Sequence, residues 1–141
     1  MADLKSEAKI NDREKGTLLK LDFSKLSNAV KCGDLIPVVV QDIDTKDVLI
    51  LGYMNEEALS KTLADKVITF WSTSRNRLWV KGDVSGDYLD VEDVRVNCEQ
   101  NSLLFLVRLR GKGVCHVKKS DGNAYKTCFY RRITGGNLEF L

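Results

Sequence analysis

The sequence predicts a single α+β domain in which a mainly antiparallel sheet carries one principal helix. Its 141 residues match the usual size of one domain. Short β-branched runs recur along the chain, and most are separated by brief turn sequences, which favour antiparallel pairing. One amphipathic helical pattern follows the first pair of runs, which completes an α+β order of elements.

Residues 1–20 are mostly polar, and we expect them to form a mobile or loosely docked arm ahead of a folded domain of residues 21–141. The segment L-D-F-S-K-L-S-N-A-V-K comes next and predicts a short amphipathic helix. Gly33 is a natural stop for this helix. Its expected apolar face consists of Leu21, Phe23, Leu26 and Val30.

Residues 35–41 and 48–54 are β-branched runs that predict two strands. The intervening D-I-D-T-K-D has the composition of a turn, so the two strands should form a hairpin. Pro37 is the only proline, and we expect it near a sheet edge or a strand end because it cannot donate a ladder hydrogen bond.

Residues 55–66 predict the principal helix. Asn55 is a good N-cap, and Glu56 and Glu57 suit the positive end of the helix dipole. The expected inner face consists of Ala58, Leu59, Thr62 and Leu63.

The rest of the chain predicts further strands separated by polar loops. Alternation in the run 88–98 slips once in phase, and E-Q-N after it reads as a turn. The loops S-T-S-R-N-R and G-D-V-S-G-D precede that run. The expected strands are residues 67–71, 78–81, 88–98, 102–110 and a last one around 125–133.

Charge and hydropathy exclude some classes of protein. With 22 basic and 20 acidic residues the net charge is +2, too small to indicate a nucleic acid polymer or a membrane surface as partner. No apolar run approaches the roughly 20 residues that a membrane span needs. The polar N-terminus predicts a cytoplasmic protein, in which thiols stay reduced.

Three of the four cysteines lie between Arg95 and Arg132: Cys98, Cys115 and Cys128. Reduced cysteines in such a set indicate metal or catalytic thiols, and a catalytic zinc typically keeps three protein ligands. The spacings of 17 and 13 residues are not those of a zinc ribbon, so spacing alone favours three unrelated buried cysteines over a zinc site. Cys32 we expect to be a buried small hydrophobe.

His116 is the only histidine and directly follows Cys115. It could be a fourth ligand, a general acid or base beside the metal, or an ordinary surface residue. Neighbouring residues of an extended chain point to opposite faces, which argues mildly against a shared metal. Three thiolates give zinc a net negative charge, so a base and nearby cations would help activate water. The candidate cations are Lys112, Lys118, Lys119, Arg131 and Arg132.

The zinc nucleobase deaminases are excluded. Their signature is H-x-E followed by P-C-x-x-C, whereas here Val117 follows His116 and the only proline is Pro37.

Several stretches together resemble the phosphoribosyl-AMP cyclohydrolase family. In chain order they are I-P-V-V-V-Q-D, L-G-Y-M-N-E-E-A-L, F-W-S-T-S-R-N-R-L-W-V-K-G-D-V-S-G, V-N-C, and G-V-C-H with a later C-F-Y-R-R. The similarity covers residues 35–132, and the stretches are specific in combination although each is weak alone.

The resemblance implies a Zn2+ ion held by Cys98, Cys115 and Cys128 at the interface of an intertwined homodimer, with ligands from both chains. It implies hydrolysis of the adenine ring of 1-(5-phosphoribosyl)-AMP at the N1–C6 bond, the third step of histidine biosynthesis. Zinc would activate the water and His116 would be the proton carrier.

The substrate carries two phosphate groups, which suit the basic clusters and the glycine-rich loop. Trp71 and Trp79 could stack on the base or could be core or interface residues. The candidate substrate-binding residues are Trp71, Ser72, Ser74, Arg75, Lys81, Gly82, Ser85 and Gly86.

The sequence departs from the family beside Cys98. The family surrounds this cysteine with aspartates that bind magnesium, D-C-D-x-D, where this chain has Asn97, Glu99 and Asn101. We therefore expect Mg2+ to bind weakly, or only when substrate phosphate completes the site. Val80 also replaces a histidine that is usual in the family.

The stretch between Cys115 and Cys128 is longer than usual, and its insert K-K-S-D-G-N-A-Y could be a lid or a recognition loop. No fused pyrophosphohydrolase domain is expected, because the sequence ends at Leu141. Other interpretations remain open: a paralogue acting on another purine nucleotide, a non-catalytic zinc module closed by His116, and a redox protein pairing Cys115 with Cys128.

Overall fold

A computed structural model of the chain describes residues 13–141, so most of the arm expected at residues 1–20 lies outside the described residues. The described elements are short and closely spaced. In chain order they are α2 (Lys25–Val30), β1 (Ile36–Asp42), β2 (Val48–Met54), α3 (Glu56–Asp65), β3 (Thr69–Ser72), β4 (Arg77–Val80), β5 (Leu89–Val96), β6 (Leu103–Leu109), β7 (Arg131–Thr134) and β8 (Asn137–Phe140).

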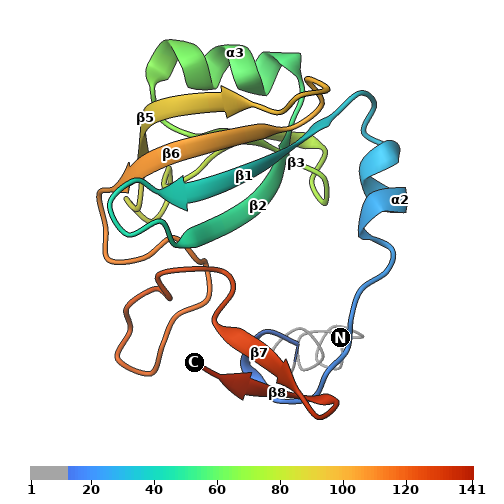
Figure 1. Cartoon of the computed structure of the whole chain (residues 1–141), viewed down its shortest axis with the longest axis vertical. Coiled ribbons are helices and arrows are strands. Elements are labelled where there is room, and N and C mark those ends of the chain that lie inside the picture. Colours follow the sequence, from blue (N-terminus) through green and yellow to red (C-terminus); the bar gives the residue numbers. More distant parts are fainter. Residues whose placement is uncertain (1–12) are drawn as a thin grey trace.

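The main sheet has four strands in the order β2-β1-β6-β5, with α3 beyond its β5 side (Figure 1). Its β1–β2 and β5–β6 pairs are antiparallel, as are the separate hairpins β3–β4 and β7–β8, which confirms the mainly antiparallel α+β prediction. The exception is the central pair β1–β6, which is parallel. Parallel neighbours need a long crossover, and the crossover here carries α3 and the β3–β4 hairpin.

The core is formed by apolar side chains of this sheet, of α3 and of β3. Asn55 caps α3 as predicted, its side chain accepting from the backbone of Ala58 at 2.8 Å. Ala58 and Thr62 are buried, but Leu63 is 50% exposed, so its assignment to the inner face was wrong. The buried apolar cluster consists of Val38, Val40, Leu49, Ile50, Met54, Ala58, Ile68, Phe70, Leu89, Phe105, Val107 and Val114.

The early strands follow the sequence closely. β1 and β2 form the predicted hairpin, and Pro37 lies near the start of β1, before its pairing with β6 begins at Val38. The register of β5 shifts between Val91 and Asp93, which is where the alternation slips in phase. β3 begins at Thr69, two residues later than the predicted start at residue 67.

The C-terminal strand was predicted in the wrong place. Residues 125–130 are irregular and form no continuous strand ladder. Their backbone groups bond instead to single positions in β2 and in the loop after β6; Cys128 N–H, for example, donates to Leu49 C=O. The chain then forms the β7–β8 hairpin around Gly135 and Gly136, both at positive φ. A two-glycine turn flanked by the apolar residues Ile133 and Leu138 is a hairpin signal that the strand prediction overlooked.

The apolar face of the first helix was mispredicted. α2 begins at Lys25, and of its residues only Ala29 is buried. The expected apolar face is exposed in the single chain, from 60% at Leu21 to 90% at Phe23. Amphipathic spacing predicted a helix correctly, but no residue within 13–141 covers its apolar side.

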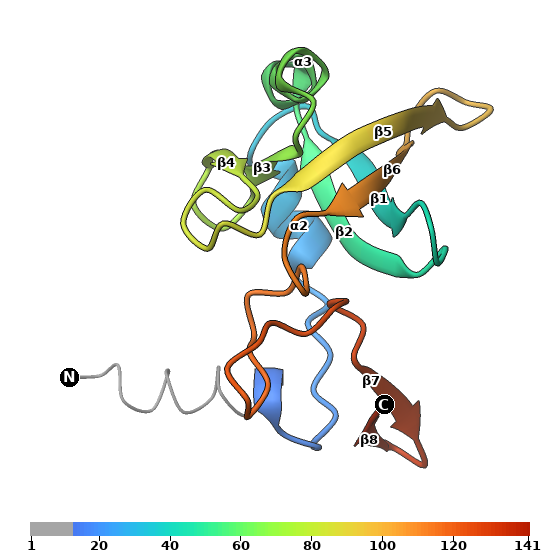
Figure 2. The ribbon, with the colours of Figure 1, turned by 90° about the vertical axis from the view of Figure 1, so that its left-hand side faces the viewer.

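A smaller layer lies below the sheet, formed by the segment after β6 and by residues 13–24 (Figures 1 and 2). The start of the described chain runs beside β7 and β8. Leu138 N–H donates to Thr17 C=O at 2.7 Å, and Leu18 forms an isolated antiparallel β-bridge with Asn137. No helix within residues 13–141 is both long and apolar enough to cross a membrane.

Candidate active site

The β3–β4 hairpin supplies one wall of the site. Ser72 Oγ accepts from the backbone N–H of Arg75 at 3.2 Å and lies 3.3 Å from Ser74 Oγ. These contacts form a tight turn that Asn76 closes at φ 53°. The turn therefore holds the two hydroxyls and the Arg75 guanidinium on one rim.

The loop after β4 is fixed by its glycines. Gly82 adopts φ 96°, and a Cβ there would lie 2.4 Å from Tyr88 N, so glycine is required. Gly86 N–H donates to Gly82 C=O at 2.7 Å and closes the loop. Ser85 Oγ accepts from Asp87 N–H at 3.2 Å.

Lys81 enters the site from the end of β4 and is only 4% exposed. No residue among 13–141 forms an ion pair with its ammonium. Burial lowers the pKa of Lys81 below its ordinary value, although the charges of Asp87, Cys128 and Cys115 oppose the shift. A buried cation without a carboxylate partner is suited to an anionic ligand.

Cys115 is held by the loop that follows β6. Its backbone N–H donates to Tyr125 C=O at 3.1 Å, and its sulfur accepts from Val117 N–H at 3.4 Å. Gly113 permits this close approach, since a Cβ there would lie 2.4 Å from the Tyr125 oxygen. Cys115 is consequently buried, with 5% exposure.

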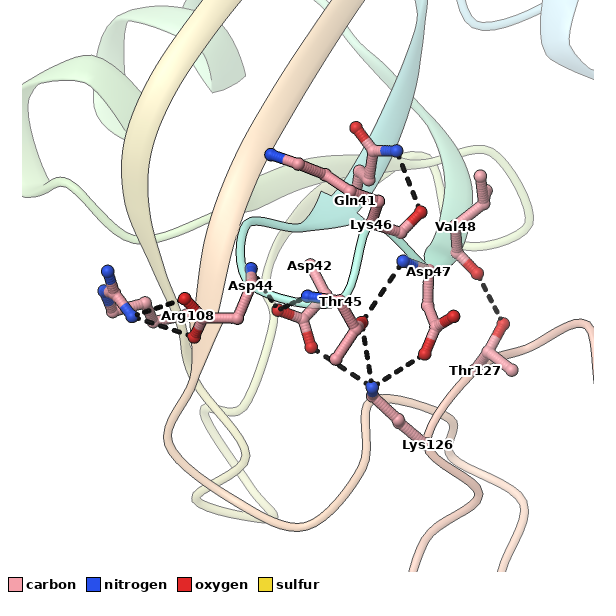
Figure 3. A network of polar contacts seen from close by, with 10 residues as sticks. All are labelled: Gln41, Asp42, Asp44, Thr45, Lys46, Asp47, Val48, Arg108, Lys126 and Thr127. Carbon is pink, nitrogen blue, oxygen red and sulfur yellow. Dashed lines mark hydrogen bonds and ion pairs between the residues drawn. The ribbon is translucent and has the colours of Figure 1, made fainter.

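Cys128 is held against β2 by its neighbours. Its N–H donates to Leu49 C=O at 2.9 Å, and Thr127 Oγ1 donates to Val48 C=O at 2.8 Å. Lys126 reaches into the β1–β2 turn, where its Nζ lies 2.7 Å from Asp47 and 3.2 Å from Asp42 (Figure 3). Three consecutive residues thus anchor this thiol to the sheet.

The two thiols face one another. A hydrogen bond from Cys128 lowers the pKa of Cys115 to about 6, with burial opposing and the Val117 N–H assisting. The same hydrogen bond, together with burial, raises the pKa of Cys128. Two neighbouring thiols of this kind are suited to binding a soft divalent ion, which displaces their protons.

Two cavities flank His116. The larger encloses about 560 Å3 and the smaller about 340 Å3, and both also border Ser72, Ser74 and Trp79. Basic and small polar groups line the larger one: Ser72, Ser74, Arg75, Trp79, Lys81, Gly82, Val84, Ser85, Asp87, Cys115, His116 and Lys118. The smaller one is richer in aromatic groups, with Tyr53, Phe70, Trp71 and Trp79. Trp71 Nε1 is buried there without a hydrogen-bond partner among the described residues.

Cys98 is not brought to the other two thiols within one chain. It lies in the turn before β6, whereas Cys115 lies beyond the far end of that strand. The strand between them has seven residues and, at about 3.3 Å per residue, is roughly 20 Å long. Across residues 13–141, no group of three or more metal-binding side chains comes together. Cys115 and Cys128 therefore fit part of a thiolate zinc site, and Cys98, which is exposed, lies apart from them.

The turn carrying Cys98 is held by amide side chains. Asn97 Oδ1 accepts from the backbone N–H groups of Asn101 and Ser102, both at 2.9 Å. Asn97 Nδ2 donates to Asn101 Oδ1 at 2.6 Å, and Asn101 Nδ2 donates to Glu99 at 3.1 Å. The oxygens that Mg2+ would need are already engaged, and one carboxylate is available, so these residues do not fit a magnesium ion.

The structure gathers most of the predicted substrate-binding residues and separates a few. Trp71 lines only the smaller cavity, and Gly86 lines neither cavity. Of the predicted cations, Lys118 borders the larger cavity, while Arg131 donates to backbone carbonyls of residues 13 and 16. Glu14 and Asp87 were missed, since nothing in their local sequence distinguishes them from solvated carboxylates. The predicted residues that share the larger cavity are Ser72, Ser74, Arg75, Lys81, Gly82, Ser85, Cys115 and His116.

Comparisons with known proteins identify the family of this chain. The family model described as phosphoribosyl-AMP cyclohydrolase matches residues 50–130. A protein of that name from Desulforapulum autotrophicum is 39% identical over 120 residues, which is 85% of this chain and 86% of its own length. Another from Hyphomonas neptunium is 46% identical over 106 residues, covering 75% of this chain and 76% of its own.

Longer proteins match as well. The histidine biosynthesis bifunctional protein HisIE of Pasteurella multocida is 42% identical over 113 residues, or 80% of this chain. This chain spans about half the length of such bifunctional relatives, 50% in this case.

Proposed function

Because this chain belongs to the phosphoribosyl-AMP cyclohydrolase family, we propose that it hydrolyses the adenine ring of 1-(5-phosphoribosyl)-AMP at the N1–C6 bond, within histidine biosynthesis. The observation that carries the proposal is the larger cavity. It combines Lys81, which is buried and has no ion-pair partner within residues 13–141, and the Arg75 rim with Cys115 and His116. Such a cavity offers cations to phosphate groups together with one soft metal ligand, Cys115.

We propose that zinc is the metal and that two chains share each site. Cys115 and Cys128 of one chain would hold the ion together with Cys98 of a second copy. The separation of Cys98 from the other thiols along β6 supports this arrangement. A zinc ion in that position supplies Lewis acidity toward water and the purine ring. A reducing compartment such as the cytoplasm would keep the three thiols free.

A homodimer would also cover apolar surface that the single chain leaves open. Exposed apolar surface of this kind marks interfaces. The exposed apolar side chains include Leu21, Phe23, Leu26, Val30, Leu51, Phe129, Ile133 and Leu141.

Within the cavity the residues divide into two tasks. Arg75 and Lys81 would bind the substrate's phosphate groups and offset negative charge, with Lys118 adding to the positive field. His116 borders both cavities and would move the proton between water and the ring nitrogen that leaves. We propose that this chain works without magnesium bound at Asn97, Glu99 and Asn101, unless substrate phosphate completes a weak site.

Mixing two inactive variants tests the activity and the shared site together. Cys98→Ala and Cys115→Ala should each fail to turn over phosphoribosyl-AMP. In a mixed dimer, one site receives both defects and the other receives neither. After random exchange of chains, half the dimers are mixed, so the mixture should regain about a quarter of the wild-type rate.

A site built within one chain would regain nothing on mixing, which would refute the shared site. A wild-type protein inactive on phosphoribosyl-AMP but active on another purine nucleotide would refute the substrate. Cobalt substitution adds a structural control, because four protein ligands without exchangeable water would indicate a closed, non-catalytic site.

A further inference from the structure

His116 has one carboxylate partner among the described residues, and it comes from the other end of the sequence. His116 Nε2 lies 2.8 Å from Glu14 Oε1, across 102 positions of chain. The imidazole is otherwise exposed, with 71% of its side chain accessible, whereas the Glu14 side chain is 30% accessible. An exposed ring with one strong contact takes its orientation from that contact.

The segment carrying Glu14 is itself firmly held. Tyr130 Oη donates to Glu14 C=O, and the Arg131 guanidinium donates to the carbonyls of Arg13 at 2.7 Å and Gly16 at 2.8 Å. Arg131 also stacks over the Tyr130 ring at 4.9 Å. Two neighbouring residues thus fix the backbone on both sides of Glu14.

The same two neighbours belong to the layer that carries the thiols. Tyr130 packs with Cys115 and Val117 in a small buried cluster, and it stacks on Tyr125 at a centroid distance of 4.0 Å. Glu14 is therefore connected to the Cys115 loop through Tyr130, and the start of the described chain lies beside the segment after β6 (Figure 2). Its carboxylate can hold the imidazole in a fixed direction relative to the cavity.

We propose that Glu14 is a positioning residue that accepts the Nε2–H of His116, so that the other ring nitrogen, Nδ1, is the one left free for proton transfer. The role follows from the directionality of the contact, since a carboxylate accepts and the imidazole must donate. The contact between Glu14 and His116 is independent of the proposed function; only the proton transfer assigned to Nδ1 rests on that function. Glu14 lies outside residues 50–130, the part of the chain that the family model matches.

The first test needs no activity. His116 is the only histidine, so the full-length, zinc-loaded protein should show a single imidazole in nitrogen-detected NMR. Above the pH range where ordinary imidazoles titrate, we expect an Nε2–H proton protected from solvent exchange in the wild type. Glu14→Ala should lose that signal, and Lys15→Ala, at the next and exposed position, should keep it. An unprotected ring in the wild type would overturn the proposal.

The second test is kinetic. Glu14→Ala should lower kcat by about 10- to 100-fold, the usual effect of losing a group that orients a site residue, while KM stays within about twofold. Glu14→Gln keeps an acceptor oxygen and should lose less. In a His116→Ala background Glu14→Ala should have no further effect, because the group it positions is gone.

The outcomes separate this proposal from the proposed function. A wild type inactive on phosphoribosyl-AMP refutes the function and leaves the NMR result to decide the contact. An active enzyme in which Glu14→Ala and His116→Ala lower kcat independently refutes the positioning role. The zinc content of each variant is measured as a control. If Glu14→Ala has lost its metal, Glu14→Gln replaces it in the comparison.

Discussion

The four-stranded sheet and the segment after β6 are held together by different forces. The sheet and α3 enclose an apolar cluster in which Phe105, Leu49 and Val38 are fully buried. The segment has only a small buried cluster of Cys115, Val117 and Tyr130. It is otherwise attached through hydrogen bonds, ion pairs and stacked aromatic rings. The sheet is stable by burial, whereas the segment is placed by directional contacts.

This difference explains where the site lies. The sheet and its hairpin present the cavity wall with Arg75 and Lys81, while the segment brings the thiols and His116 against it. A change in the sheet should therefore alter the stability of the whole chain. A change in the segment should instead alter metal binding, dimer formation or the rate of catalysis.

Removing one aromatic side chain from each region should give the largest contrast. Phe105→Ala leaves a cavity in the core and should lower the free energy of unfolding by about 3–5 kcal/mol. Phe129→Ala removes a ring that is half exposed in one chain, and should cost about 0.5 kcal/mol or less in folding while weakening the dimer. Urea unfolding at fixed protein concentration and analytical ultracentrifugation measure the two effects. Equal losses in folding would contradict the contrast.

The anchor of the segment should give a smaller effect. Lys126→Met removes the cation from Asp42, which is buried, and should cost about 1 kcal/mol. The matched control is Lys61→Met, which breaks an exposed ion pair with Asp65 and should cost about 0.3–0.5 kcal/mol.

The effect of Lys126→Met should depend on pH. Burial raises the pKa of Asp42, but the N–H groups of Asp44 and Thr45 and the Lys126 ammonium outweigh it, so the folded pKa lies below the ordinary value. Stability from this carboxylate is therefore present above about pH 4 and lost as pH falls through the folded pKa. The gap between wild type and variant should shrink in acid, and a gap that widens there would contradict this account.

Magnesium should have the smallest effect on the wild type. Millimolar Mg2+ should shift its melting temperature by less than about 1 °C, because the oxygens of Asn97 and Asn101 are engaged in the turn. The double variant Asn97→Asp, Asn101→Asp should melt lower without Mg2+, since two carboxylates then repel, and should recover when Mg2+ is added. Strong magnesium binding by the wild type in calorimetry would show that the turn rearranges around the ion.

Local patterns predicted the sheet better than the attached segment. β1, β2 and α3 each carry their own alternation, turn or cap, so their positions follow from short stretches of sequence. Residues 125–130 and the apolar side of α2 depend on remote partners, and there the predictions were wrong. Leu63 shows the same limit, since the 3.6-residue period could not determine how wide the covered face of α3 would be.

The sequence by itself determined the family, the strands that carry Ser72 to Ser85, and the identity of the candidate metal ligands, because these depend on motifs and short-range periodicity. Only the tertiary structure decided that the Cys128 segment lies against β2, and that Glu14 lies against His116. Contacts across such distances along the chain depend on how the layers pack. No local pattern of residues records that packing.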